Sequence, residues 1–208
     1  MMRNAKIHRT LAPEQFGSRK NLQAIDLAVN KVLTNDILCQ LKSPGAICAN
    51  NAKSCYDLIV HPSAVLAMRR QGVPESVMTC LFNTLQEVKH QVRMAFGDLD
   101  TSFGGNEVIP MHGICQGNGA GPLIWAVISS PILDILRNKD LGTFLTTAIT
   151  YKAIRFSGFS FVDDTDIQTA RSNQEMWQEV VHGLQTSMNH WEGGLRACGG
   201  AIVPSKTA

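Results

Sequence analysis

Two adjacent acids, Asp163 and Asp164, are the residues of this chain whose types and spacing are best suited to chemistry. They follow the apolar run FSFV at residues 159–162 and precede a second β-prone run, which predicts a hairpin with both acids at its turn. Carboxylates presented together at a tight turn can bind divalent cations, which stabilise charge in phosphoryl and nucleotidyl transfer. A solvated turn without chemistry has the same pattern, so the rest of the chain must discriminate.

A glycine-rich loop, QGNGAGP at residues 116–122, precedes an apolar stretch with the length of a helix. Glycines before a helix N-terminus let the backbone approach a phosphate or a base, although a flexible connector has the same composition. Pro122 stands where a dinucleotide-binding fingerprint needs a glycine, and the acid expected about 20 residues later is missing, which argues against a nicotinamide-dependent enzyme.

The elements that must position these residues alternate irregularly between helices and strands and include at least two hairpins, which predicts an α+β fold. Apolar residues at helical spacing predict two amphipathic helices. One carries Leu22, Ile25, Val29 and Val32, and the other begins at the capping box of residues 172–175 and ends at Gly193-Gly194. The second helix is expected to bury Trp177, Val181, Leu184, Met188 and Trp191. Further helices are predicted from Pro62, over 77–88 and over 124–136, with a buried strand at 46–49 and hairpins within 92–110 and 149–169.

Composition bounds the class of protein. With 208 residues, 44% of them hydrophobic and 17% charged, the chain is long enough for one domain with a real core. A net charge of +2 neither requires nor excludes a nucleic-acid partner. The six cysteines form no C-x-x-C pair, so we expect no zinc site; several lie in apolar runs and are expected to be buried thiols in a reducing, intracellular compartment, nuclear or cytoplasmic. No signal peptide and no membrane-spanning run is expected.

Taken in order, five segments resemble the reverse transcriptases of non-LTR retrotransposons. The run NAKSCYD at residues 51–57 matches the first core motif, QGNGAGP at 116–122 the second, FVDD at 161–164 the third and GGAIVPSK at 199–206 a fourth. Upstream, QFGSRK at 15–20 matches the fingers segment. The resemblance covers residues 15–206 and implies a right-hand polymerase palm, an antiparallel sheet backed by helices, with part of the fingers. Residues 1–14 are expected to be loosely ordered.

The resemblance also implies roles in adding deoxynucleotides (dNTPs) to a DNA primer on an RNA template. Asp163 and Asp164 would hold two Mg²⁺ ions, or Mn²⁺ in their place, for two-metal nucleotidyl transfer, and Tyr56 would exclude a ribose 2′-hydroxyl. Gln116 and Gly117 would line the incoming nucleotide. The basic residues would act on phosphate: Lys206 by protonating the pyrophosphate leaving group, Arg19 and Lys20 by contact.

Two departures from the family bear on activity. Asn51 stands where the family has its first metal-binding aspartate, and a neutral amide cannot bridge two metal ions as a carboxylate does. The chain also stops just after Lys206, so the family's thumb is expected to be absent. A degenerate or truncated element with impaired activity is therefore the main reading. The alternative is a non-catalytic nucleic-acid-binding or interaction module; a phospho-acceptor domain fits less well, because it needs regularly alternating strands and helices. The oligomeric state stays open.

Overall fold

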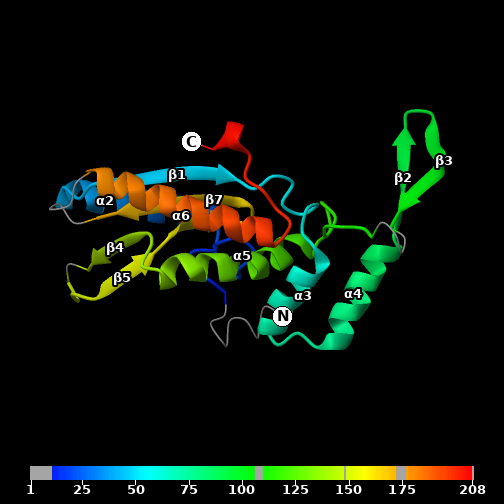
Figure 1. Ribbon diagram of the computed structural model, residues 1–208, viewed down its shortest axis with the longest axis horizontal. Helices are drawn as coiled ribbons and strands as arrows, with labels where there is room; N and C mark the ends of the chain where they lie inside the picture. Colours follow the sequence, from blue (N-terminus) through cyan, green and yellow to red (C-terminus); the bar gives the residue numbers. More distant parts are fainter. Residues whose placement is uncertain (1–10, 106–109, 148, 172–176, 208) are drawn as a thin grey trace.

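The computed structural model describes residues 11–105, 110–147, 149–171 and 177–207. A five-stranded sheet lies at its centre, with helices on both faces (Figure 1). The strand pairs are antiparallel, as predicted, except for a short parallel contact between Thr143 and Ala170. The order is β1 (Gly45–Asn51), β7 (Asp164–Ala170), β4 (Thr143–Thr146) and β5 (Ala153–Phe156), with β6 (Gly158–Phe161) also pairing with β7.

Side chains of β7 alternate between two helical layers, as the pleat of a strand requires. Asp166 and Gln168 face helix α2 (Ala24–Leu41): Lys31 Nζ lies 2.5 Å from Asp166 Oδ2, and Gln168 hydrogen-bonds to Asn35. The opposite face of the sheet packs against α6 (Trp177–Ala197), where Gly183 lies against Thr169. Odd- and even-numbered positions of this strand therefore have different neighbours.

Helix α5 (Gly121–Asn138) is the buried helix predicted from residues 124–136. Its side chains Ile124, Trp125, Ile128 and Leu133 are almost fully buried in the main core. The other predicted helices are present as α3 (His61–Arg70) and α4 (Glu75–Glu87). Strands β2 (Lys89–Met94) and β3 (Gly97–Gly104) form a separate hairpin that projects from the body (Figure 1).

The predicted buried face of α6 is only partly right. Trp191 is fully buried and Leu184 and Met188 are half-buried against the core, as predicted, whereas Trp177 and Val181 are exposed. The buried residues also include Val180, Gly183, Ser187 and Leu195, because small residues at 183 and 187 let the helix approach the sheet closely. The helix also continues through Gly193-Gly194 to Ala197, and Gly194 packs directly against Ile132 of α5. The predicted capping box at 172–175 lies outside the described residues.

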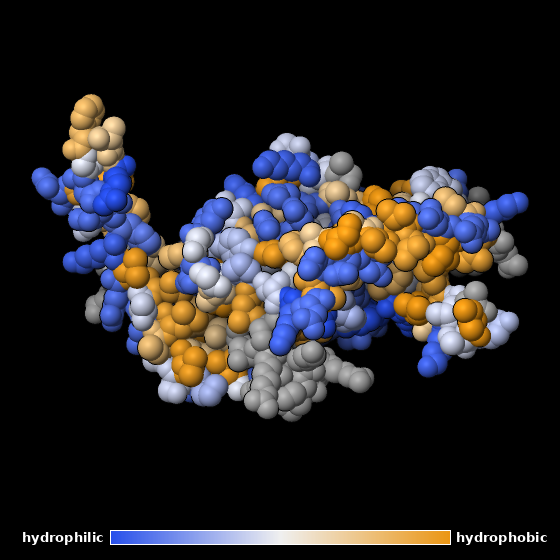
Figure 2. Space-filling model, turned by 180° about the vertical axis from the view of Figure 1, so that it is seen from behind, coloured by the Kyte–Doolittle hydropathy of each residue, from blue (hydrophilic) through white to orange (hydrophobic). Residues whose placement is uncertain are grey.

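The apolar side chains predicted to form the buried face of the first helix are mostly on its surface. Helix α2 exists, but Ile25 is 62% and Val32 58% exposed, and its buried residues are Thr34 and Leu38. Apolar side chains are visible on this side of the molecule in Figure 2. The periodicity of the sequence therefore predicted the helix correctly but not the side that packs on the sheet.

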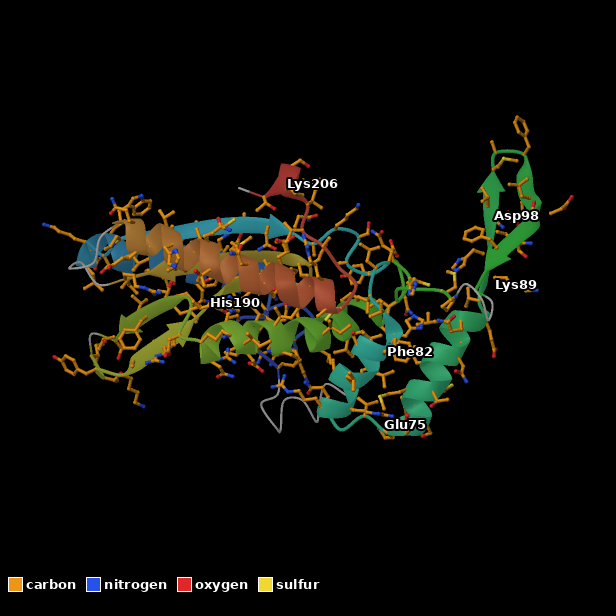
Figure 3. The ribbon with its side chains drawn as sticks, in the orientation of Figure 1. Glu75, Phe82, Lys89, Asp98, His190 and Lys206 are labelled. Atoms are coloured by element: carbon orange, nitrogen blue, oxygen red, sulfur yellow. The ribbon has the colours of Figure 1, made fainter. Side chains whose placement is uncertain are left out.

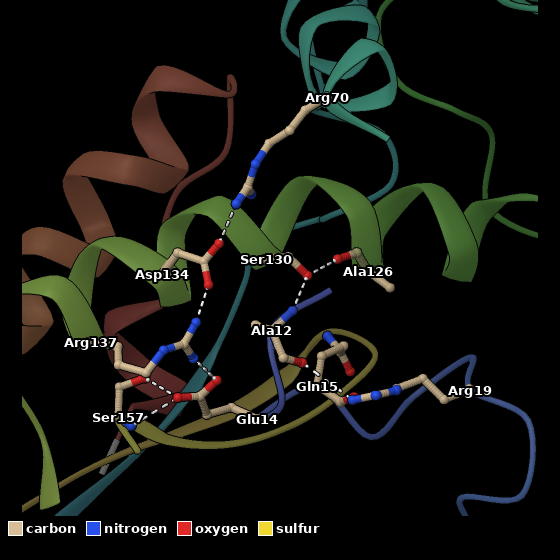
Figure 4. A network of polar contacts seen from close by, with 10 residues as sticks. All are labelled: Ala12, Glu14, Gln15, Arg19, Arg70, Ala126, Ser130, Asp134, Arg137 and Ser157. Atoms are coloured by element: carbon tan, nitrogen blue, oxygen red, sulfur yellow. Dashed lines mark hydrogen bonds and ion pairs between the residues drawn. The ribbon is translucent and has the colours of Figure 1, made fainter. Parts of the chain in front are cut away.

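A buried ion pair joins the N-terminal segment to the core (Figure 4). Glu14 is 2% exposed; its Oε2 lies 2.5 Å from Arg137 Nη1, and its Oε1 accepts hydrogen bonds from the backbone N–H and hydroxyl of Ser157. Arg137 also pairs with Asp134, which pairs with Arg70 of α3. Leu11, Ala12 and Glu14 are thus packed, although the sequence placed them in a loose segment; residues 1–10 lie outside the described part.

The prediction that several cysteines are buried is only partly confirmed. Cys55 is buried, whereas Cys39 and Cys80 are exposed; Cys48, Cys115 and Cys198 are half-buried, and all six thiols are free. Among the described residues, no helix combines the length and the apolar character needed to cross a bilayer.

Candidate active site

The two predicted acids lie at the hairpin between β6 and β7. Phe161 pairs with Asp164, so Val162 and Asp163 form the two-residue turn between the strands. Val162 has a φ of 57°, a left-handed conformation that branched side chains rarely adopt. Asp163 is half-buried and Asp164 is exposed, which leaves both carboxylates at the end of the sheet rather than in its core.

Asn51 lies beside this turn. It is the last residue of β1 and stands opposite Asp164 in the antiparallel ladder, so the two side chains project from one face of the sheet. The preceding Asn50 points the other way and is buried: it accepts a hydrogen bond of 2.8 Å from Trp191 Nε1 and donates to the carbonyl of Thr165. Of the two neighbouring asparagines, only Asn51 therefore lies on the face of Asp164.

Cys55 and Tyr56, just beyond β1, face Asp163. Burial, the charge of Asp163 and a hydrogen bond to that carboxylate raise the pKa of the Cys55 thiol to about 12. Burial, and then the charges of Cys55 and Asp163, raise the pKa of the Tyr56 phenol to about 12. The buried Cys55 thiol and the half-buried Tyr56 ring thus lie next to Asp163.

The glycine-rich loop also lies next to Tyr56. The backbone N–H of Ile114 donates to the carbonyl of Tyr56, and a Cβ on Gly121 would lie 3.5 Å from the Tyr56 ring. Gln116 and Gly117 are exposed, and the Gln116 N–H lies 3.4 Å from Asp57 Oδ1. The structure therefore brings the start of α5 and its loop next to Tyr56, about 60 residues away in the sequence.

The predicted basic residues occupy different surroundings. Arg19 is half-buried and donates from Nη1 to the carbonyls of Ala12 and Gln15, so its guanidinium supports the N-terminal segment. Lys20 is exposed. Lys206 is exposed in a short 3-10 helix, η1 (Pro204–Lys206), above the end of β1 (Figure 3).

The C-terminal segment reaches β1 through the backbone. The N–H of Val203 donates to the carbonyl of Asn51 at 3.1 Å, and Ala52 forms an isolated antiparallel bridge with Ile202. This pairing brings the GGAIVPSK segment to the strand that carries Asn51. No measured contact joins the Lys206 side chain to the acids among the described residues, so its predicted role stays a prediction.

Sequence reasoning missed two residues next to Asp163. Cys55 lies within the first motif, and the one local signal for it is its position between the predicted strand end and Tyr56. Gln15 is fully buried and hydrogen-bonds to both backbone groups of Val162. No sequence signal could have found that contact, because it joins residues 147 positions apart.

The donor set suits one Mg²⁺ better than two. Within the part of the chain that the structure describes, no three His, Cys, Asp or Glu side chains gather as a metal site. Two carboxylates, Asp163 and Asp164, and the amide oxygen of Asn51 are hard oxygen donors of the kind Mg²⁺ takes when substrate phosphates complete its shell. The residues present therefore fit a divalent cation, with water or substrate phosphates as its remaining ligands.

Comparison with known proteins gives a fold. No protein-family model and no curated protein sequence matches the chain. Among solved structures, apo telomerase from Candida tropicalis has a TM-score of 0.61 at 12% identity, with all of this chain and 34% of that chain covered. Telomerase from Candida albicans, in complex with a fragment of telomeric RNA, has a TM-score of 0.55 at 13% identity, with 100% and 32% covered.

The chain thus spans about a third of the length of these telomerase chains. At such identities the likeness concerns the fold alone. Telomerase is a reverse transcriptase-related polymerase, and the observed sheet backed by helices matches its palm. The chain has the mixed α+β fold of a polymerase-like palm.

Proposed function

We propose that this chain is the palm, with part of the fingers, of an RNA-directed DNA polymerase of the non-LTR retrotransposon type, with activity impaired at Asn51. One observation carries the proposal: the β1–β7 register sets Asn51 against Asp164 beside the turn that presents Asp163. A polymerase palm brings its metal-binding acids together from these two strands. The reaction is the transfer of a deoxynucleotide from a dNTP to a primer 3′ end on an RNA template.

Each residue of the site has a part that follows from its position. Asp163 and Asp164 would hold Mg²⁺ or Mn²⁺, which when bound lowers the pKa of the primer hydroxyl and neutralises phosphate charge. The half-buried Tyr56 ring lies beside Asp163, where it would exclude a ribose 2′-hydroxyl. The exposed backbone at Gln116 and Gly117, next to Tyr56, would lie along the nucleotide.

The basic residues are proposed to act on phosphate. Lys206 would donate a proton to the pyrophosphate leaving group, since its ammonium group is solvent-exposed on the segment that pairs with β1. Lys20 is exposed and Arg19 half-buried near the same hairpin, where they would contact the charged backbone of a nucleic acid.

Asn51 limits this site. The family's first aspartate contributes a negative charge that a neutral amide does not replace, so less positive charge can be held where the phosphates react. Losing one such electrostatic contact lowers a rate by about 10²–10³-fold. We expect weak or absent primer extension in the chain as it stands.

The test is primer extension on an RNA template with Mg²⁺ and with Mn²⁺, comparing the chain with its Asn51→Asp variant. Extension by the variant, at least about 10²-fold faster than by the unchanged chain, supports a reverse transcriptase site limited by one residue. An Asn50→Asp control should not extend, because residue 50 faces Trp191 instead of the acids. No extension by a folded Asn51→Asp variant contradicts the proposal.

A second candidate is a nucleic-acid-binding module without catalysis. It is favoured by the lack of a three-ligand metal cluster among the described residues, and by the Cys55 thiol, which lies against Asp163. Two of the telomerase structures are complexes with a telomeric RNA fragment, which makes RNA the first ligand to try. RNA binding that is unchanged by a metal chelator and by Asp163→Asn would support this candidate.

A further inference from the structure

The turn that presents Asp163 is held in an unfavourable backbone conformation. Val162 is its first residue and has a φ of 57°. Glycine is the residue that adopts such angles freely, and a branched side chain does so only where its surroundings impose it. Val162 therefore needs partners that hold its peptide groups in place.

A single buried amide binds both backbone groups of Val162. Gln15 is 0% exposed, its Nε2 donates to the carbonyl of Val162 at 3.1 Å, and its Oε1 accepts from the N–H of Val162 at 3.0 Å. The same amide also donates to the hydroxyls of Ser160 (3.0 Å) and Ser129 (3.3 Å) and accepts from the N–H of Gly17. Both ends of the amide are thus satisfied without water, which fixes its orientation.

Two neighbours complete the enclosure of the turn. Trp125 Nε1, in α5, also donates to the Val162 carbonyl at 2.6 Å. Gly17 lies so close that a Cβ there would be 2.3 Å from the Val162 nitrogen. Of these three residues, Gln15 alone hydrogen-bonds to both the N–H and the carbonyl of Val162, so it restrains the peptide groups on both sides of that residue.

We propose that Gln15 is a positioning residue for the site: by holding Val162 in its left-handed conformation, it aims the carboxylate of Asp163, the next residue, at the position where phosphate and cation meet. The proposal rests on the proposed function in one respect, that Asp163 is a metal-binding group. Residues that orient ligands through hydrogen bonds commonly change metal affinity by about 10–100-fold when replaced.

The experiment compares Gln15→Leu with a matched control, Gln86→Leu. Gln86 also binds one residue through both backbone groups: its Nε2 donates to the carbonyl of Met111 at 2.7 Å, and its Oε1 accepts from the N–H at 2.9 Å. Mn²⁺ affinity is measured by electron paramagnetic resonance and stability by urea unfolding. Both variants should lose stability, but only Gln15→Leu should weaken Mn²⁺ binding, by about tenfold or more.

A second substitution separates positioning from a general loss of structure. Val162→Gly removes the steric cost that Gln15 must offset, since glycine adopts the left-handed conformation without cost from a side chain. In the Gln15→Leu/Val162→Gly double variant we expect most of the Mn²⁺ affinity to return, to within about threefold of Val162→Gly alone. Where Gln15→Leu does not fold, Gln15→Glu, which keeps the size and the acceptor oxygen, takes its place.

A readout without metal separates the two proposals. If the unchanged chain binds no Mn²⁺, the metal role of Asp163 fails, but the conformation of Val162 can still be followed by NMR, from its backbone chemical shifts and from the coupling between its N–H and Hα, which reports φ. Changed values at Val162 in Gln15→Leu, but not in Gln86→Leu, support positioning. Unchanged values at Val162, or Mn²⁺ affinity equal to that of Gln86→Leu, overturn it.

Discussion

Asn51 and Asp164 stand directly opposite each other in the β1–β7 ladder, on the face of the sheet next to the Asp163 turn. An amide beside a carboxylate avoids the repulsion that two carboxylates would have in the same place. Asn51, which on the proposed function would weaken the site for chemistry, is therefore expected to stabilise the fold in the absence of a cation.

Asn51→Asp should make stability depend on Mg²⁺. Two like charges directly opposite on a sheet cost about 0.2–1 kcal/mol, and a cation that binds only the folded state reverses the loss. Thermal unfolding with and without Mg²⁺ measures this: the variant should be less stable than the unchanged chain without Mg²⁺ and gain more from adding it. An equal response to Mg²⁺ in both proteins would show that residue 51 is not part of a cation site.

The two adjacent asparagines should behave differently when replaced by alanine. Asn50→Ala leaves the buried Trp191 N–H without its acceptor, which costs about 1–3 kcal/mol of unfolding free energy. Asn51→Ala removes a half-buried side chain without such a partner and should change stability by only about 0.5 kcal/mol. Urea unfolding of both variants checks the prediction, and equal losses would mean that the face assignment of β1 is wrong.

The free energy of unfolding should fall as the pH rises above about 9, because Cys55 and Tyr56 lose their protons less readily in the folded chain than in the unfolded chain. The pKa of each is raised in the folded state to about 12, from 9.0 for the thiol and 10.0 for the phenol, so the unfolded chain loses its protons first. The contribution of each group is complete below its unfolded pKa and is lost as the pH rises through its folded pKa.

The measurement is urea unfolding across this pH range, with Cys55→Ser as the comparison. The variant lacks the thiol, so its stability should fall less steeply above pH 9 than that of the unchanged chain. Asp163→Asn should also reduce the slope, because the charge of Asp163 is the second-largest cause of the raised Cys55 pKa. Identical slopes in all three proteins would contradict the contact between Cys55 and Asp163.

Breaking the buried pair of Glu14 and Arg137 should be costly (Figure 4). Arg137→Met leaves the carboxylate of Glu14, 2% exposed, without its cation, a loss of about 3–5 kcal/mol. The Glu14→Leu/Arg137→Met double variant should recover much of this, because no buried charge is left unpaired. Equilibrium unfolding of the single and double variants measures this recovery. A double variant as unstable as Arg137→Met would refute this account.

Gly17→Ala should disturb the hairpin turn. The new Cβ would meet the Val162 nitrogen at 2.3 Å, so the chain must shift, and such overpacking costs about 1–3 kcal/mol. Gly119→Ala is the control, since no atom of the described residues lies within 4 Å of a Cβ at that position. Thermal unfolding should separate the two, and a harmless Gly17→Ala would show that the segment does not press on the turn.

Local sequence patterns were sufficient where neighbours in the chain decide the structure. The hairpin at Asp163, the buried helix after the glycine loop and the strand ending at Asn51 are all present, because turn chemistry and apolar runs act over a few residues. The resemblance-based assignment of the site residues, including Gln116, Gly117 and Lys206, stays a prediction, although the structure brings the loop and the C-terminal segment close to Tyr56 and Asn51.

Packing between distant segments decided the rest. The buried face of α6 was set by close approach at Gly183, and the helix continued through Gly194 because Ile132 of another helix packs there. The sequence by itself determined that these elements form and that two acids share a turn, but it did not predict strand β4 of the sheet. Only the tertiary structure determined that Cys55 rests on Asp163 and that Gln15 holds Val162, because such contacts depend on side chains brought together across the whole fold.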